Sequence, residues 1–310
     1  MQRRKTLIPL IVTLLAIAVP AGAIDPFRPS GGTERQDQPR AIRLTSTQQL
    51  DLSPYEGLGT WIDMYDADPW KYPELAVADL AQRGVQTIYL ETANWHKPAG
   101  PLFKPTKIGR FIEAAHQNGI YVVAWYVPGF KNIYKDKKRI RAALDYVSPL
   151  QETFDSFALD IESTVINDYT KRVRRMTRLS AWLREKVGPD YAMGGIVPDV
   201  QSLFWGDFPY ATVAAYFDVM MPMSYFTYRV SGRAAVKSYV TANFTEIRAE
   251  VGDPSLRIHN IGGIGGRSTR REARAYTNSV LNNGGIGGSY YDYPITAERE
   301  WEELYPLIGL

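Results

Sequence analysis

Apolar and polar residues follow two alternating patterns along the chain from Tyr55 to the C-terminus. Short apolar runs, such as VQTIYLET at 85–92, are each followed by a segment whose apolar residues recur every three or four positions, as in KIGRFIEAAHQNG at 107–119. The first pattern is typical of buried strands, and the second is typical of amphipathic helices that cover a sheet. The chain is therefore expected to alternate strand and helix.

Eight pairs of this kind are expected between 55 and 310, which is the count of the (β/α)8 barrel. We predict an α/β protein that forms a single-domain TIM barrel. An open, doubly wound sheet would alternate in the same way, but the first strand lacks the Gly-rich phosphate loop typical of that fold. The expected strands are 57–66, 85–92, 120–130, 154–163, 191–200, 217–226, 256–263 and 286–293.

The first 54 residues do not share this pattern. Residues 1–23 have a basic start, an apolar middle at 7–19 and small residues at 21–23, which predicts a secretory signal peptide cut after Ala23. An uncleaved membrane anchor is the alternative, which Pro9, Pro20 and the short apolar length disfavour. Residues 24–54 are rich in Pro, Gly, Gln, Thr and Arg, and are expected to form a flexible linker. The protein is thus expected to be secreted or attached to the cell surface.

Composition excludes several classes of function. The formal charge of +3 falls to about zero without the three basic residues of the predicted signal peptide, so nothing in the charge favours nucleic acid. The chain has no cysteine, which excludes disulfides, thiol catalysis and a lipid-anchored cysteine. Basic runs at 135–141 and 171–178 lie in expected helices and are interpreted as solvated outer faces.

The stretch FDSFALDIES at 154–163 carries the strongest chemical signal. Side chains alternate across a strand, so Asp160 and Glu162 are expected on one face, with the apolar residues 157, 159 and 161 on the other. Two unpaired carboxylates in an apolar interior would cost several kcal/mol each. We therefore expect both at the open, carboxyl end of the strand, although a buried ion-pair network serving only the fold is the alternative.

The order Asp155, Ala158, Asp160 and Glu162 resembles the DxxDxDxE signature of glycoside hydrolase family 18, the chitinases and their relatives. The resemblance implies that Glu162 is the proton donor and that Asp160 orients the N-acetyl group of the substrate, which acts as the nucleophile. Ala158 departs from the signature, which has Asp there. A second segment, Met223 to Tyr225, resembles the family's MxY segment, with Phe226 in place of the usual acid or amide.

The barrel interpretation places the active site at the carboxyl ends of the strands. Carboxylates and flat aromatic rings gather at those ends, and this mixture suits a carbohydrate, because acids bind hydroxyls and rings stack on sugar C–H surfaces. A one-residue slip in the third strand would exchange Trp125 for Tyr126. The candidate substrate-binding residues are Asp63, Glu91, Trp125, Tyr126, Asp199, Met223, Tyr225, Tyr291 and Asp292.

Residues in the loops that follow the expected strands are candidates for further binding roles. Trp95 and Trp205 lie in aromatic loops and are candidate walls for sugar subsites. None of the three histidines has the neighbours that a zinc site needs, so no metal or cofactor is expected. The Gly-rich run at 262–266, with Arg267 and Arg270 nearby, would fit a phosphate, although a close-packed turn is the simpler interpretation.

The sequence thus predicts a secreted glycosidase that acts on a polysaccharide or cell-wall glycan, with Glu162 as general acid assisted by Asp160. If the substrate lacks an N-acetyl group, Glu91, Asp63 or Asp292 must supply a second carboxylate. A catalytically inactive, lectin-like barrel and a phosphate-ester enzyme are the alternatives. The expected partner is a carbohydrate, with no nucleic acid, no membrane beyond the N-terminal segment, and a monomeric state.

Overall fold

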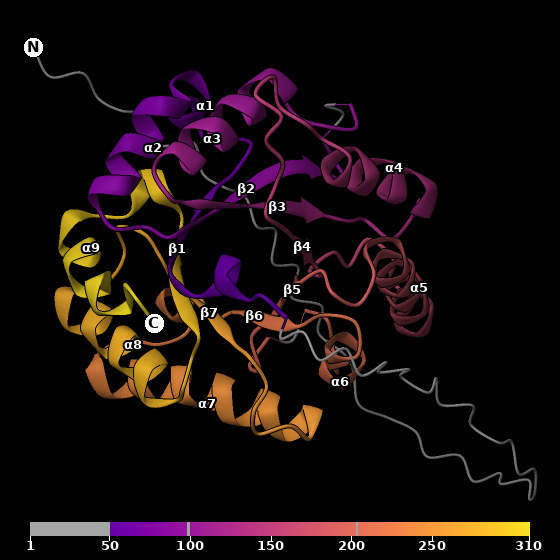
Figure 1. The fold of residues 1–310 in the computed structure, drawn as a ribbon. Helices are drawn as coiled ribbons and strands as arrows, with labels where there is room; N and C mark the ends of the chain where they lie inside the picture. Colours follow the sequence, from indigo (N-terminus) through magenta and orange to yellow (C-terminus); the bar gives the residue numbers. More distant parts are fainter. Residues whose placement is uncertain (1–49, 98–99, 203) are drawn as a thin grey trace, which may run out of the picture. The chain divides into compact units, whose positions relative to one another are not determined.

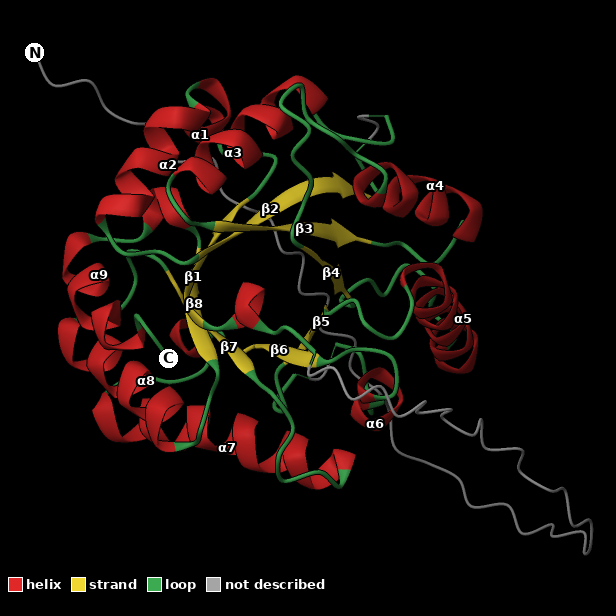
Figure 2. Cartoon of the chain, viewed as in Figure 1, coloured by secondary structure: helices red, strands yellow, loops and turns green. Residues whose placement is uncertain are grey.

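The computed structural model describes residues 50–97, 100–202 and 204–310. Within these ranges eight parallel strands close into a barrel, each hydrogen-bonded to the next in chain order and the last to the first. Figure 1 shows β1 to β7 following one another around the barrel, and Figure 2 also labels β8, next to β1. The prediction of a single-domain TIM barrel is confirmed. The strands are β1 Gly57–Ile62, β2 Thr87–Asn94, β3 Tyr121–Val127, β4 Ser156–Asp160, β5 Met193–Pro198, β6 Val219–Met223, β7 His259–Ile264 and β8 Gly287–Tyr291.

Helices surround the barrel on its outer side, as Figure 2 shows. No helix in the described ranges combines the length and hydrophobicity needed to cross a membrane. The helices are α1 Ala67–Lys71, α2 Pro73–Gln82, α3 Pro105–Gln117, α4 Ile133–Leu144, α5 Tyr169–Val187, α6 Tyr210–Ala214, α7 Arg233–Val251, α8 Arg270–Asn282 and α9 Glu298–Leu304, with short 3-10 turns at Ser53–Tyr55, Phe226–Tyr228, Tyr293–Ile295 and Tyr305–Leu307.

Strand alternation divides the core into two layers. One apolar cluster fills the barrel interior and includes Trp61, Trp125 and Met223. The other lies between the strands and the helices and includes Tyr126 and Phe226. The neighbours Trp125 and Tyr126 thus point to opposite sides of β3, as the two-residue period of a strand requires. This settles which of them faces the barrel interior.

The amino-terminal end of the barrel is closed by Tyr55. Its ring is fully buried in the interior cluster, and its hydroxyl donates to the carbonyl of Phe157 at 2.9 Å and lies 2.6 Å from Ser156 Oγ. Leu50 and Leu52 pack against the same cluster. The last residues of the predicted linker, 50–54, therefore belong to the barrel, whereas the predicted signal peptide and the rest of the linker lie outside the described residues.

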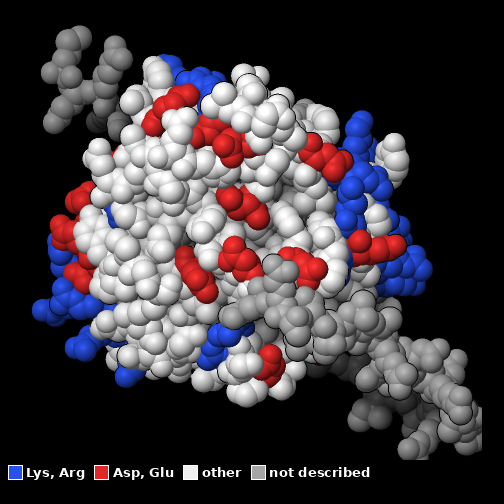
Figure 3. Space-filling view, in the orientation of Figure 1, with Lys and Arg blue, Asp and Glu red and all other residues white. Residues whose placement is uncertain are grey.

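The basic runs cover the outer face of the barrel. Lys135, Lys138, Lys171 and Arg174 are exposed on α4 and α5. Figure 3 shows basic side chains gathered at the edge of the molecule where these two helices lie. The expected solvated face is thus present.

Candidate active site

The two carboxylates of the central stretch lie at the carboxyl end of β4. Asp160 is the last residue of the strand and is 3% exposed, while Glu162 follows it in the next turn and is exposed. Ala158 lies below Asp160 in the interior cluster. The strand alternation therefore places Asp160 on the inner side of the barrel, at its mouth, and Glu162 lies in the turn beyond it.

Trp125 is a hydrogen-bond partner of Asp160. Its Nε1 donates to Asp160 Oδ2 at 2.9 Å, and Asp160 Oδ1 is buried with no partner among the described residues. An unpartnered buried carboxylate oxygen is costly, so this atom is poised to accept a hydrogen bond from a ligand.

The environment keeps protons on these acids at higher pH than usual. Burial, then repulsion from Glu162, raises the pKa of Asp160 well above its ordinary value, although the Trp125 hydrogen bond opposes the shift. The pKa of Glu162 is also raised, because the surrounding protein displaces water from its carboxyl even though the residue is exposed at the rim. A carboxyl that holds its proton near neutral pH can act as a general acid.

Glu91 on β2 is a third inward-facing acid. It is 1% exposed, and its two oxygens accept from Met64 N at 2.8 Å and from Asn94 Nδ2 at 3.0 Å. Burial raises the pKa of Glu91 to about 7, with smaller contributions from the charges of Asp63 and Glu162. Asn94, which fixes the Glu91 carboxyl, was not predicted, because nothing in the sequence shows that β2 bulges after Glu91.

Aromatic rings surround the acids on the same side of the barrel. Trp125 meets Trp61 edge to face at 5.1 Å between centroids, and meets Tyr291 edge to face at 6.1 Å. Tyr225 lies 6.0 Å from Tyr291, and its pKa is raised by burial and then by the nearby charges of Asp160 and Glu162. With Met223 at the end of β6, these rings form an apolar surround for the carboxylates.

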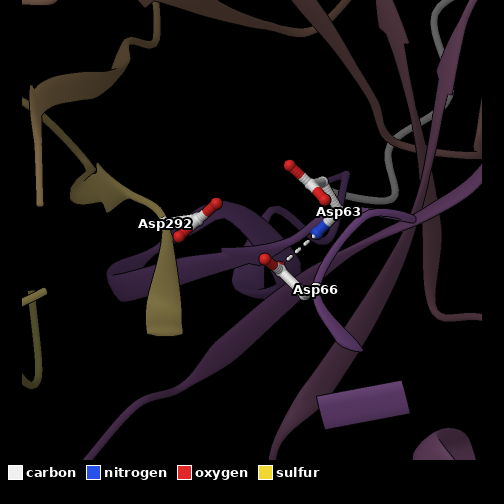
Figure 4. Close-up of side chains that lie close together, drawn as sticks. All are labelled: Asp63, Asp66 and Asp292. Atoms are coloured by element: carbon white, nitrogen blue, oxygen red, sulfur yellow. Dashed lines mark hydrogen bonds between the residues drawn. The ribbon is translucent and has the colours of Figure 1, made fainter. Parts of the chain in front are cut away.

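A second acidic group lies where β1 and β8 end. Asp63, Asp66 and Asp292 each place a carboxylate oxygen within 4.8 Å of the others. Figure 4 shows how the three side chains lie. Asp63 Oδ2 accepts from the hydroxyl of Tyr291 at 2.6 Å, and Asp66 Oδ2 accepts from Asp63 N at 2.9 Å. Burial and the neighbouring charges raise the pKa of Asp66 to about 9 and that of Asp292 to about 7.

Asp66 was missed because it was placed inside the first strand. That strand ends at Ile62, and the turn after it returns the Asp66 side chain to the barrel mouth. The only sequence signal is the cluster of acids in DMYDAD at 63–68.

Two of the predicted substrate-binding residues, Tyr126 and Asp199, do not lie with the acids at the barrel mouth. Tyr126 points outward, and its hydroxyl donates to Asp136 Oδ1 at 2.6 Å. Asp199 accepts from Ser202 Oγ at 3.0 Å and from Arg229 Nη2 at 3.1 Å, so the buried Asp199 pairs with an exposed arginine beside β5. Tyr126 directly follows the inward-facing Trp125, and Asp199 directly follows the inward-facing Pro198. Because successive side chains of a strand point to opposite sides, Tyr126 and Asp199 point outward.

The first acid of the family 18 signature has a structural role. Asp155 precedes β4, at the opposite end from Asp160, where its Oδ2 accepts from Val122 N at 2.6 Å and pairs with His116 Nε2 at 3.0 Å. His116 Nδ1 also pairs with Glu152 at 2.7 Å. Hydrogen bonds to Asp155 and Glu152 raise the pKa of His116 to about 9. Phe226 likewise packs outward, against Tyr276 and Tyr290.

The two aromatic loops differ in exposure. Trp205 is 1% exposed and packs against Arg172, whose guanidinium lies 4.4 Å from the ring centroid. It is therefore a packed residue instead of the expected subsite wall. Trp95 is half-buried and stacks edge to face with His96, near the barrel mouth.

The Gly-rich run after β7 already holds an anion from the chain itself. Glu300 of α9 accepts from Gly266 N at 2.6 Å, from Ser268 N at 2.9 Å and from Ser268 Oγ at 2.7 Å. Arg270 pairs with Glu302 and Glu303. Two backbone donors of this turn and the Arg270 guanidinium are thus engaged by protein carboxylates, and the Arg267 guanidinium lies over the ring of Tyr228.

Comparisons with known proteins identify the fold. No family model and no curated protein matches the chain. A family 18 chitinase from Cycas revoluta, solved with a GlcNAc trimer, aligns over 81% of this chain and 98% of its own, with TM-score 0.58 and 10% identity. A spore cortex-lytic enzyme from Bacillus cereus aligns over 80% and 73%, with TM-score 0.61 and 11% identity. An endo-β-1,4-mannanase from Thermotoga petrophila aligns over 83% and 77%, with TM-score 0.62 and 8% identity.

These likenesses show that the chain shares the (β/α)8 barrel fold with chitinases, a cortex-lytic enzyme and mannanases. The resemblance to family 18 is thus confirmed at the level of the fold. At such low identities the comparison concerns the fold, so function must be argued from the site.

Proposed function

We propose that this protein is a glycoside hydrolase that cleaves a polysaccharide or cell-wall glycan, with Glu162 as general acid and Asp160 as its assistant. The observation that carries the proposal is the pair of neighbouring carboxyls, Asp160 at the end of β4 and Glu162 in the turn that follows, whose pKa values are both raised because the protein displaces water from them. Glu162 is exposed at the rim, where it can protonate the oxygen of a leaving sugar.

Asp160 supports a substrate-assisted route. Its free Oδ1 can accept from the N–H of an N-acetyl group, while Trp125 holds Oδ2. The acetyl oxygen would then attack the anomeric carbon as Glu162 protonates the leaving oxygen, and configuration would be retained. On a substrate without this group, Glu91 is the proposed second carboxylate, since its charge raises the pKa of Asp160 and its own pKa is raised by the charge of Glu162.

The test is the release of new reducing ends from a panel of polysaccharides, including chitin oligomers, peptidoglycan and deacetylated glucosamine polymers. Glu162→Gln removes the proton and is expected to lower turnover at least about 100-fold, the usual range for a general acid. Glu185→Gln is the matched control, because Glu185 is exposed on the outer helix α5. Appreciable hydrolysis by the Glu162 variant would remove Glu162 from the mechanism.

A lectin-like barrel is the second candidate, and Ala158 favours it. The family's middle Asp is replaced here by a methyl group at 0% exposure, so Asp160 has no carboxyl partner beneath it in the strand. Saturable glycan binding without cleavage, equal in wild type and Glu162→Gln, would support this candidate. The phosphate-ester alternative loses its basis, because Glu300 occupies the donors of the Gly-rich run.

We further propose that the protein is exported, with residues 1–23 removed. The support is the sequence pattern of the first 23 residues. Mass spectrometry of protein from the culture medium should show a chain that begins at Ile24. A cell-associated protein that retains Met1 would instead support the uncleaved anchor.

A further inference from the structure

The acidic group at the ends of β1 and β8 has no role in the hydrolysis proposed above. It consists of Asp63 and Asp66, from the turn after β1, and Asp292, which follows β8. Figure 4 shows the carboxyl group of Asp292 facing the two aspartates across the seam between these strands. One ligand atom from each residue lies within 4.8 Å of the other two.

This negative charge is not balanced by protein cations. Across residues 50–97, 100–202 and 204–310, no Lys, Arg or His forms an ion pair with any of the three. Asp63 is 8% exposed and Asp292 is 5% exposed, so two of the carboxylates are removed from bulk water. Burial of like charges this close is strongly unfavourable without a counter-ion or a proton.

A separate observation points to a missing ligand. Asp292 Oδ1 is buried and has no hydrogen-bond partner among the described residues. The oxygens of Asp63 are oriented by Tyr65 N at 2.6 Å and by the Tyr291 hydroxyl at 2.6 Å, which leaves lone pairs available on both. The Asp63 carboxylate is thus held in place by hydrogen bonds, whereas Asp292 Oδ1 lacks a hydrogen-bond partner among the described residues.

We infer that Asp63, Asp66 and Asp292 form a binding site for a hard divalent cation of the Ca²⁺ or Mg²⁺ type. Such ions take carboxylate oxygens as ligands and complete their coordination with water, which can enter from the barrel mouth. One ion would offset most of the local charge and give Asp292 Oδ1 a partner. It would also join β1 to β8, the two strands whose pairing closes the barrel.

Binding is tested on the full chain after EDTA treatment and transfer to chelator-free buffer. CaCl₂ and MgCl₂ are titrated separately by isothermal calorimetry, and thermal unfolding is followed over the same concentrations. We expect one ion per chain, with a dissociation constant of roughly 10⁻⁵ to 10⁻³ M. The unfolding temperature should rise with the logarithm of ion concentration above that value. Preference for Mg²⁺ would indicate a compact octahedral site, and preference for Ca²⁺ a wider one.

Substitution of the proposed ligands tests where the ion binds. Asp292→Asn and Asp66→Asn should each weaken binding at least tenfold, with folding checked by circular dichroism in the absence of metal. Asp68→Asn is the matched control, because Asp68 is exposed, carries the same charge and lies two residues from Asp66. It should bind within twofold of wild type.

The site is overturned by any of three results. The first is that wild type shows no saturable binding of either ion up to about 10 mM. The second is that wild type and both site variants bind the ion equally well. The third is that Asp68→Asn weakens ion binding as much as the site variants do, which would assign the effect to diffuse charge. None of these readouts depends on hydrolysis, so failure of the glycosidase proposal leaves this test intact.

Discussion

Trp125 lowers the pKa of Asp160 through one hydrogen bond. Burial and Glu162 push the carboxyl toward its protonated form, and the Nε1 donor is the opposing influence that favours the carboxylate. The proposed mechanism needs Asp160 as the carboxylate, since it stabilises positive charge that develops at the sugar. Trp125 should therefore set the pH at which the enzyme becomes active.

Trp125→Phe keeps a ring at this position and removes the donor. A hydrogen bond to a charged group contributes about 1.5–3 kcal/mol, so the acidic limb of the kcat/KM profile should move up by about one pH unit or more. Trp61→Phe is the control, because Trp61 Nε1 donates to Ser289 Oγ at 2.8 Å, away from the acids. Identical pH profiles for Trp125→Phe and wild type would show that Asp160 does not govern this limb.

His116 makes a pH-dependent contribution to stability. Its pKa is raised to about 9 in the folded protein by Asp155 and Glu152, against 6.5 when unfolded. The contribution is therefore complete below about pH 6.5 and disappears as the pH rises through about 9.

His116→Gln should lower the free energy of unfolding by about 2 kcal/mol at pH 6, allowing for the exposed Glu152, and by much less at pH 10. Urea denaturation at both pH values measures the difference. His96→Gln is the control, since burial lowers the pKa of His96 and its loss gives no such change between pH 6.5 and 9. A constant deficit for His116→Gln at all pH values would mean that only packing was lost.

At the level of elements, α9 is attached to the turn after β7 through Glu300. This side chain is 0% exposed and accepts from Gly266 N, Ser268 N and Ser268 Oγ, and also from Ala297 N at 2.8 Å. The Gly-rich run closely approaches the turn before α9, since a Cβ on Gly265 would lie 2.6 Å from Thr296 N. The glycines therefore serve packing, as the simpler of the two sequence interpretations holds.

Glu300→Ala leaves several buried donors without an acceptor. Each unsatisfied group costs about 1–3 kcal/mol, so the free energy of unfolding should fall by about 3 kcal/mol or more. Glu302→Ala is the control on the same helix, because its pairing with Arg270 is at the surface and should contribute about 0–1 kcal/mol. Similar denaturation midpoints for the two variants would contradict the role given to Glu300.

At the level of the whole molecule, alternation of strand and helix patterns was enough to predict the barrel. It also put Asp160 on the same face of β4 as Ala158, because the apolar residues fix the phase of this strand, whereas Glu162 lies in the turn beyond the strand. The catalytic roles of both acids stay predictions. Tyr126 and Asp199 could not be placed, since their strands are apolar on both faces and a shift of one residue leaves the pattern unchanged. Asp66 and Glu300 depend on contacts between segments that only the closed barrel brings together.

The residue at which the folded domain begins also depends on contacts that form only in the closed barrel. Polar composition up to residue 54 suggested a linker, but Leu50, Leu52 and Tyr55 seal the amino-terminal end of the interior cluster. Leu50 and Leu52 carry no periodic signal, so the sequence alone assigned them to the linker, whereas Tyr55 was predicted to begin the barrel domain. The boundary can be tested by comparing chains that begin at 50 and at 56.

The chain 50–310 should unfold cooperatively, whereas 56–310 should lose about 3–5 kcal/mol or more, the usual result of removing a large buried aromatic side chain. Tyr55→Phe in the longer chain separates the two contributions of this residue. It retains the ring and removes the hydroxyl bonds to Ser156 and Phe157, so a loss of only about 1–2 kcal/mol is expected. Equal denaturation midpoints for 50–310 and 56–310 would show that the barrel closes without this seal, and the folded unit would then begin at β1.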